Sequence, residues 1–221
     1  VAFNLMLGVW MEQEIREQPE ALRANSNRYF SQLSEFLSGK RFDMVLLAAR
    51  GSSDNAALYA RYLLEIHLQV PVCLAAPSVL TRYGSKVKYP HCLAIGISQS
   101  GAAPDVAEVL GELRAQGHAT LGITNTADSR LVHTAEHSLL LEVGEERSVA
   151  ATKTYSASLL ACYQLTRALG ADLPDATEAS LPSATWLEDA KGFAEADLGK
   201  VLRSQVLFSL ARGYSFCTAH E

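Results

Sequence analysis

The chain has 221 residues and a formal net charge of −5, with 48% hydrophobic and 19% charged residues. This composition is typical of a globular protein and argues against disorder. The acidic balance excludes a broadly basic nucleic-acid surface. The apolar runs are too short to cross a bilayer, so we expect no contact with a membrane interior. The four cysteines show no metal-ligand spacing, which predicts free thiols in the cytoplasm and no zinc site.

The first forty residues are predicted to be helical. The segment from Met11 to Arg23 is acidic and rich in helix-forming residues. Pro19 lies within it, and because proline removes a backbone N–H and crowds the preceding turn, we expect it to separate two helices.

From Asp43 onward, short apolar runs alternate with segments of helical periodicity. This alternation is typical of a doubly wound, five-stranded parallel sheet flanked by helices. The predicted strands are Asp43–Ala49, Val70–Ala76, Cys92–Ser98, His118–Thr124 and His137–Val143. The predicted helices are Asp54–His67, Pro104–Gln116, Ala151–Ala168 and Trp186–Asp197.

The C-terminal residues repeat an earlier pattern. An apolar run followed by Ala-Arg-Gly-x-Ser occurs at residues 46–53 and again at residues 208–215. A repeat of this length indicates a duplicated domain rather than a solenoid. We therefore expect Val206–Phe216 to be the first strand of a second copy and its turn, with no helix after it.

One segment combines several groups that can bind an anion. Residues 97–105, Ile-Ser-Gln-Ser-Gly-Ala-Ala-Pro-Asp, end a predicted buried strand and begin a helix. Hydroxyls, a carboxamide and free backbone N–H groups at a helix N-terminus favour a phosphate group. The segment has neither the Walker A nor the dinucleotide-binding glycine pattern. A hydrophilic turn with serine caps is the alternative interpretation.

Two further segments occupy equivalent places in the predicted sheet. Gly51-Ser52-Ser53-Asp54-Asn55 follows the first strand, and residues 145–153 follow the fifth strand and open the longest helix. Each alone could be an ordinary loop with helix-capping residues. Since ligands bind at the carboxyl ends of the strands in such sheets, the three segments together predict one shared pocket.

These three motifs resemble the SIS (sugar isomerase) domain family, with its flavodoxin-like nucleotide-binding type of fold. The likeness is strongest to the isomerase half of the glutamine–fructose-6-phosphate amidotransferases and to the double-SIS glucosamine-6-phosphate deaminases. The matching residues are Gly51-Ser52-Ser53, Ser98-Gln99-Ser100-Gly101 with Asp105, and Glu146 with Val149-Ala150-Ala151-Thr152-Lys153. The resemblance implies an N-terminal helical segment (1–40), a first SIS domain (41–171), a linker and helix (172–199) and the start of a truncated second SIS domain (200–221).

The resemblance also implies roles for individual residues. The sugar phosphate would be held by Ser53, Ser98, Gln99 and Ser100, and the sugar would be lined by Ser52 and Val149. Two positions depart from the family pattern, because Ala103 and Ala151 stand where hydroxyl-bearing residues are usual. One phosphate donor and one sugar contact are therefore missing, which weakens the expectation of the same substrate more than the expectation of a phosphate.

The implied chemistry is proton transfer between C1 and C2 of an amino-sugar phosphate, as isomerisation or deamination. It needs general acid–base groups but no metal, redox or other cofactor. The family's acid–base groups lie in or after the second domain, so we assign no catalytic residue and expect these groups beyond residue 221. We expect Glu146 to form a structural ion pair with Arg50 or Lys153.

Two classes of function remain open. One is a cytoplasmic sugar-phosphate enzyme, for which the resemblance to the family implies a homodimer. The other is a non-catalytic sugar-phosphate sensor, as SIS domains serve in regulators. The short acidic segment before the first strand disfavours nucleic-acid binding.

Overall fold

The computed structural model describes residues 8–176 and 181–221 of the chain. The strands are β1 Met44–Ala49, β2 Val72–Leu74, β3 Cys92–Ile97, β4 Ala119–Thr124 and β5 His137–Leu140. The helices are α1 Val9–Leu37, α2 Ser52–Leu68, α3 Pro77–Thr81, α4 Pro104–Ala115, α5 Arg130–Thr134, α6 Lys153–Ala168, α7 Ala184–Val201 and α8 Phe216–His220, with a 3-10 turn, η3, at Gly213–Ser215. Residues 1–7 of the predicted N-terminal segment lie outside the described residues.

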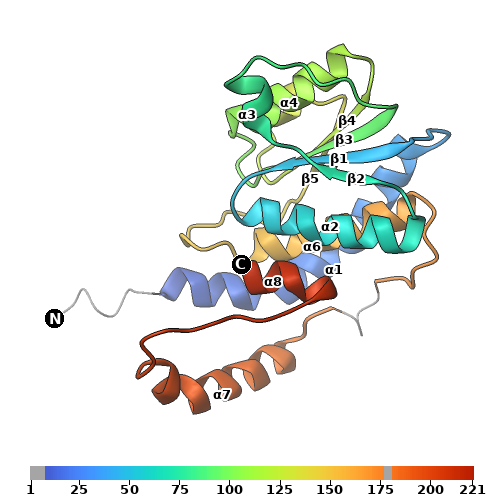
Figure 1. The fold of residues 1–221 in the computed structure, drawn as a ribbon. Coiled ribbons are helices and arrows are strands. Elements are labelled where there is room, and N and C mark those ends of the chain that lie inside the picture. The colour runs from blue at the N-terminus through green and yellow to red at the C-terminus, as the bar shows by residue number, and fades with distance from the viewer. Residues whose placement is uncertain (1–7, 177–180) are drawn as a thin grey trace.

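The five strands form one parallel sheet in the order β2-β1-β3-β4-β5. The helices cover both faces, which confirms the predicted doubly wound α/β architecture. Figure 1 shows α1, α2 and α6 on one side of the sheet and α3 and α4 on the other. All five predicted strands are present, some shorter at their ends than the apolar runs suggested.

Alternating strand residues supply the two halves of the core. Val45 and Leu47 of β1 pack with residues of α1, α2 and α6, whereas Leu46 and Ala48 pack with residues of α4 and α5. Successive side chains of a strand point to opposite faces, so a central strand of this sheet must be apolar at every position. This burial fixes the carboxyl ends of β1 and β3 side by side, since the two strands pair from Met44↔Cys92 to Ala49↔Ile97.

The predicted break at Pro19 is wrong. Helix α1 runs without interruption from Val9 to Leu37, with Pro19 buried inside it. Proline in a helix interior costs about 3 kcal/mol. The long contact of α1 with α6 offsets this cost, because it buries Leu22, Tyr29 and Leu33 in the core.

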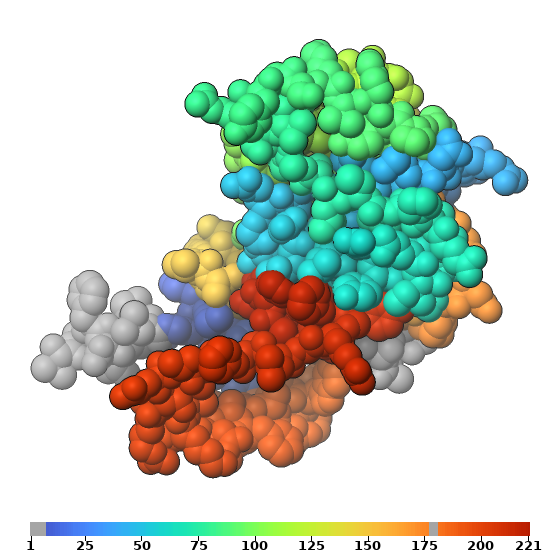
Figure 2. All heavy atoms as spheres, in the orientation of Figure 1, coloured from blue at the N-terminus to red at the C-terminus, as the bar shows by residue number. Residues whose placement is uncertain are grey.

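The predicted strand at Val206–Phe216 is also wrong. Residues 206–212 have no regular structure, and a short helix, α8, does follow the turn. Their apolar side chains are exposed: Phe208 is 84% and Leu210 is 90% accessible. A strand requires a hydrogen-bonding neighbour, and within the part of the chain that the structure describes no strand pairs with this segment. Figure 2 shows the residues from α7 to α8, orange to red, as an outer layer on the α1 side.

Candidate functional site

A pocket lies where the loops after β1, β3 and β5 meet the start of α6. It has a volume of about 210 Å³. The residues that line it are Arg50, Ser52, Ser53, Ile97, Ser98, Gln99, Ser100, Ala103, Val149, Ala151, Thr154, Tyr155 and Ser158. The strand order is β2-β1-β3-β4-β5, so β2 lies on one side of β1 and the later strands lie on the other side. The topological switch point is therefore between β1 and β3. Open α/β sheets usually bind ligands in the crevice at the carboxyl ends of the strands at this point.

The six residues predicted to bind substrate all line this one pocket. Ser52 and Ser53 form the first turn of α2, and Ser98, Gln99 and Ser100 form the turn after β3. Ser98 is buried, whereas Gln99, Ser100 and Val149 are exposed. The structure thus brings three distant segments of the sequence together. Their part in ligand binding remains a prediction.

Two helices begin at the pocket. Helix α2 starts at Ser52 and α4 at Pro104, and in neither does the residue before the helix cap it with a side-chain hydrogen bond, although the Asp105 carboxylate accepts from the Val106 N–H in the first turn of α4. Unpaired N–H groups and the partial positive charge at a helix N-terminus favour an anion. The pocket therefore combines hydroxyl donors with two positive helix ends.

Sequence reasoning missed four of the lining residues: Arg50, Thr154, Tyr155 and Ser158. Thr154 and Ser158 are four residues apart, so they share one face of α6, and this spacing was readable in the sequence. Arg50 is the one basic residue lining the pocket among those described, and its guanidinium lies 3.4 Å from the Asp105 carboxylate. The Tyr155 hydroxyl is buried, and burial raises its pKa.

The expected ion pair of Glu146 is wrong. Arg50 pairs with Asp105 and Lys153 pairs with Glu17, so neither contacts Glu146. The Glu146 carboxylate instead accepts hydrogen bonds from the Thr152 and Thr154 N–H groups, at 3.0 and 3.1 Å. These groups lie at the N-terminus of α6, where a negative charge is stabilised. Glu146 also accepts from the Gln99 carboxamide at 2.8 Å, which ties the third segment to the second.

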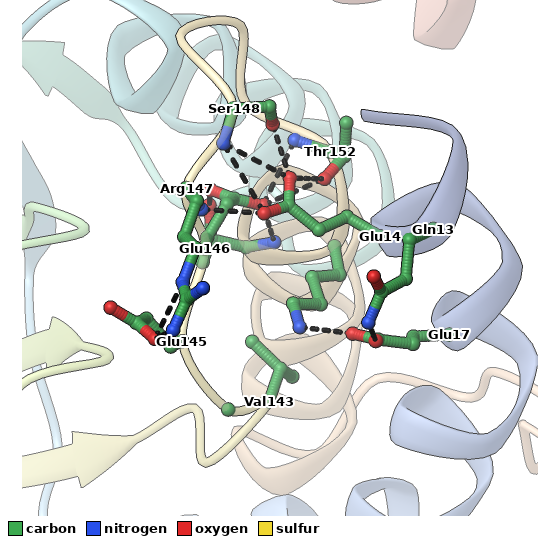
Figure 3. Close-up of polar contacts among 12 residues, drawn as sticks. Gln13, Glu14, Glu17, Val143, Glu145, Glu146, Arg147, Ser148 and Thr152 are labelled. Atoms are coloured by element: carbon green, nitrogen blue, oxygen red, sulfur yellow. Dashed lines mark hydrogen bonds and ion pairs between the residues drawn. The ribbon is translucent and has the colours of Figure 1, made fainter. Parts of the chain in front are cut away.

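A second carboxylate, Glu14 of α1, is only 3% exposed and points into the loop between β5 and α6 (Figure 3). It accepts hydrogen bonds from the N–H groups of Arg147 and Ser148 and from the Ser148 hydroxyl. The Thr152 hydroxyl lies 3.3 Å from it. Burial favours the protonated acid, but these hydrogen bonds together outweigh it and hold the pKa of Glu14 below its usual 4.5.

The lowered pKa of Glu14 predicts a pH-dependent contribution to stability. Because the pKa is lower in the folded chain, the stabilisation is complete above about pH 4.5 and is lost as the pH falls through the folded-state pKa. Glu14→Gln should lower the free energy of unfolding by about 1–3 kcal/mol at pH 7, since it replaces charge-assisted hydrogen bonds by neutral ones and removes one of the two acceptor oxygens. Urea unfolding of both proteins from pH 7 to pH 3 should show this difference narrowing below pH 4.5. A difference independent of pH would contradict the assignment.

No group of three or more histidine, cysteine, aspartate and glutamate side chains among the described residues could hold a metal ion. In the same part of the chain, no helix is long and apolar enough to cross a membrane. Cys92, Cys162 and Cys217 are buried free thiols, and Cys73 is partly exposed.

Comparison with known proteins agrees with this geometry. Glutamine–fructose-6-phosphate aminotransferase (isomerizing) of Chlamydia caviae is 39% identical over 68% of this chain and 26% of its own length. The protein of the same name from Methanothermobacter thermautotrophicus is 34% identical over 96% of this chain and 36% of its own length. The chain thus spans about a quarter to a third of these two curated relatives.

A solved structure and a family model extend the comparison. The C-terminal domain of glucosamine-fructose-6-phosphate aminotransferase from Francisella tularensis superposes with a TM-score of 0.69 at 24% identity, covering 95% of this chain and 64% of that one. This shows the same fold. The model of the SIS domain matches residues 40–168, more than half of the sequence. The chain therefore belongs to the SIS domain family.

Proposed function

We propose that the pocket binds a phosphorylated sugar, with an amino-sugar phosphate as the favoured ligand. The observation that carries this proposal is the convergence of Ser53, Ser98 and Ser100 with the N-termini of α2 and α4 on one cavity. A phosphate needs several hydrogen-bond donors and positive charge, and these groups supply both. Arg50 also lines the pocket and adds a guanidinium, which pairs with the Asp105 carboxylate at 3.4 Å.

The reaction that this site serves is aldose–ketose isomerisation or deamination. The transfer of a proton between C1 and C2 requires a general acid and a general base. The nearest carboxylate, Glu146, is occupied by hydrogen bonds from Thr152, Thr154 and Gln99. We therefore assign binding to this unit, and assign the acid and base to residues from outside it, supplied by a further SIS unit or by the partner in a homodimer.

A sugar-phosphate sensor is the second candidate. The observation that favours it is that Glu146 already accepts hydrogen bonds from Gln99 and Thr154. The described residues that line the pocket include no carboxylate that could act as a base. Incubation with glucosamine 6-phosphate in deuterium oxide separates the two functions for the protein as it occurs in the cell. Deuterium incorporation at C2 supports the enzyme, and tight binding without incorporation supports the sensor.

Ligand-induced stabilisation tests the binding proposal. A ligand that binds only the folded chain stabilises it by an amount that grows with its concentration, about 2.7 kcal/mol at 100 times the Kd. Glucosamine 6-phosphate should therefore raise the melting temperature by several degrees, measured by differential scanning fluorimetry. Glucosamine at the same concentration should leave it unchanged. Equal shifts from the two sugars would contradict a phosphate site.

A further inference from the structure

One face of the first half of α1 contacts the loop before α6 and the first turn of α6. Trp10, Glu14, Glu17 and Gln18 are spaced by three, four, seven and eight residues, which places them on the same side of the helix. We call these four residues the α1 seam. The Arg147 guanidinium lies 4.6 Å from the centre of the Trp10 ring, Glu17 pairs with Lys153, and Gln18 accepts from Ser156 at 2.6 Å.

Glu14 is the central residue of the α1 seam. It accepts hydrogen bonds in the loop from two backbone N–H groups and two hydroxyls, none of them on a cationic side chain (Figure 3). A carboxylate bound in this way fixes the backbone of residues 147–148 rather than a flexible side chain. Val149, at the mouth of the pocket, is the next residue along the chain.

A second path leads from Glu14 to Gln99, which lines the pocket. The Thr152 hydroxyl lies 3.3 Å from the Glu14 carboxylate and 2.9 Å from the Glu146 carboxylate. Glu146 in turn holds the Gln99 carboxamide at 2.8 Å. The Thr152 hydroxyl, whose single proton lies between the two carboxylates, thus connects Glu14 of α1 to the contact between Glu146 and Gln99.

We propose that Glu14 is a positioning residue for the pocket: it holds the loop that carries Val149 and, through Thr152 and Glu146, sets the orientation of Gln99. The identity of the ligand in this proposal rests on the proposed function. The role of Glu14 in holding the loop does not, because it rests on contacts within the chain. Helix α1, which precedes the sheet and lines no part of the pocket, is by this proposal a structural part of the binding site.

Glu14→Gln tests the proposal because it keeps the shape of the side chain but removes its negative charge and one of the two acceptor oxygens that the N–H and hydroxyl donors of the loop share. Affinity for glucosamine 6-phosphate, measured by calorimetry at pH 7, should fall at least tenfold. Hydrogen exchange at the Arg147 and Ser148 amides should accelerate, while the amides of β3 and β4 keep their protection. Glu20→Gln, an exposed change on the same helix, is the matched control and should keep its affinity within twofold.

A double-mutant cycle separates positioning from general destabilisation. Glu14→Gln and Thr152→Val interrupt the same path, so their losses of affinity should be less than multiplicative when combined. If Glu14→Gln does not fold, Ser148→Ala takes its place in the cycle with Thr152→Val, because it removes one hydroxyl that donates to Glu14 and keeps the backbone contacts. Fully multiplicative losses would overturn the path through Thr152.

The outcomes distinguish this proposal from the proposed function. Wild-type affinity with Glu14→Gln, or unchanged exchange at residues 147–148, would overturn the role of Glu14 even if the sugar phosphate binds. Failure of the wild-type chain to bind glucosamine 6-phosphate would overturn the proposed function. In that case hydrogen exchange alone still decides whether Glu14 holds the loop.

Discussion

Replacing Ser98 and Ser100 together by alanine is expected to abolish measurable binding of phosphorylated sugars while leaving the fold intact. Both hydroxyls line the pocket at the turn after β3. A hydrogen bond to a charged group contributes about 1.5–3 kcal/mol, so the loss of two weakens affinity by about 10² to 10⁴-fold. Calorimetric titration with glucosamine 6-phosphate measures this loss, and circular dichroism checks the fold.

The matched control is the double change of Ser31 and Ser38 to alanine. Both serines are exposed near the C-terminal end of α1, and neither lines the pocket. This control should bind as the wild type does. Unchanged affinity in the Ser98→Ala, Ser100→Ala protein would show that the phosphate lies elsewhere.

Gly101→Ala is expected to destabilise the chain by about 2–5 kcal/mol. Gly101 has a φ of +61°, and a Cβ there would lie 2.2 Å from the Ser129 Oγ and 2.9 Å from the Thr124 Oγ1. The left-handed conformation costs a residue with a Cβ about 1–2 kcal/mol, and the steric overlap adds about 1–3 kcal/mol. Urea unfolding measures the sum.

Gly117→Ala isolates the conformational part of this cost. Gly117 also has a positive φ, +89°, but no atom lies within 4 Å of the position of its Cβ. It should therefore lose only about 1–2 kcal/mol. Equal losses at the two glycines would contradict the close approach of the turn after β3 to Ser129, and with it the shape of the pocket floor.

The sheet could be predicted from the sequence because its strands are buried on both faces. An apolar run such as residues 92–97 is typical of a strand buried on both faces of a parallel sheet. The helices between the strands could be predicted from the helical periodicity of their apolar residues. The predicted site residues lie together because they follow parallel strands, whose carboxyl ends meet at one edge of the sheet.

The errors arose where tertiary contacts override local preference. Pro19 stays within a helix because the packing of α1 against α6 stabilises it. Residues 206–212 have the composition of a strand, but the described chain offers them no partner. We expected an ion pair for Glu146 because charged side chains can be identified in a sequence. The backbone N–H groups of Thr152 and Thr154 that bind it can be identified only in the structure.

The start of a second SIS domain at residue 200 stays a prediction. In the structure, Val206, Leu207, Phe208 and Leu210 belong to no strand and their apolar side chains are exposed.

The most direct test of the central claim, that three strand-end segments form one sugar-phosphate site, is a two-dimensional amide NMR titration of the intact chain. Addition of glucosamine 6-phosphate should shift the amides of residues 51–53, 98–101 and 149–154 together, with a single Kd. Glucosamine should leave them in place. Shifts confined to one of the three segments, or equal shifts with the unphosphorylated sugar, would contradict the shared pocket.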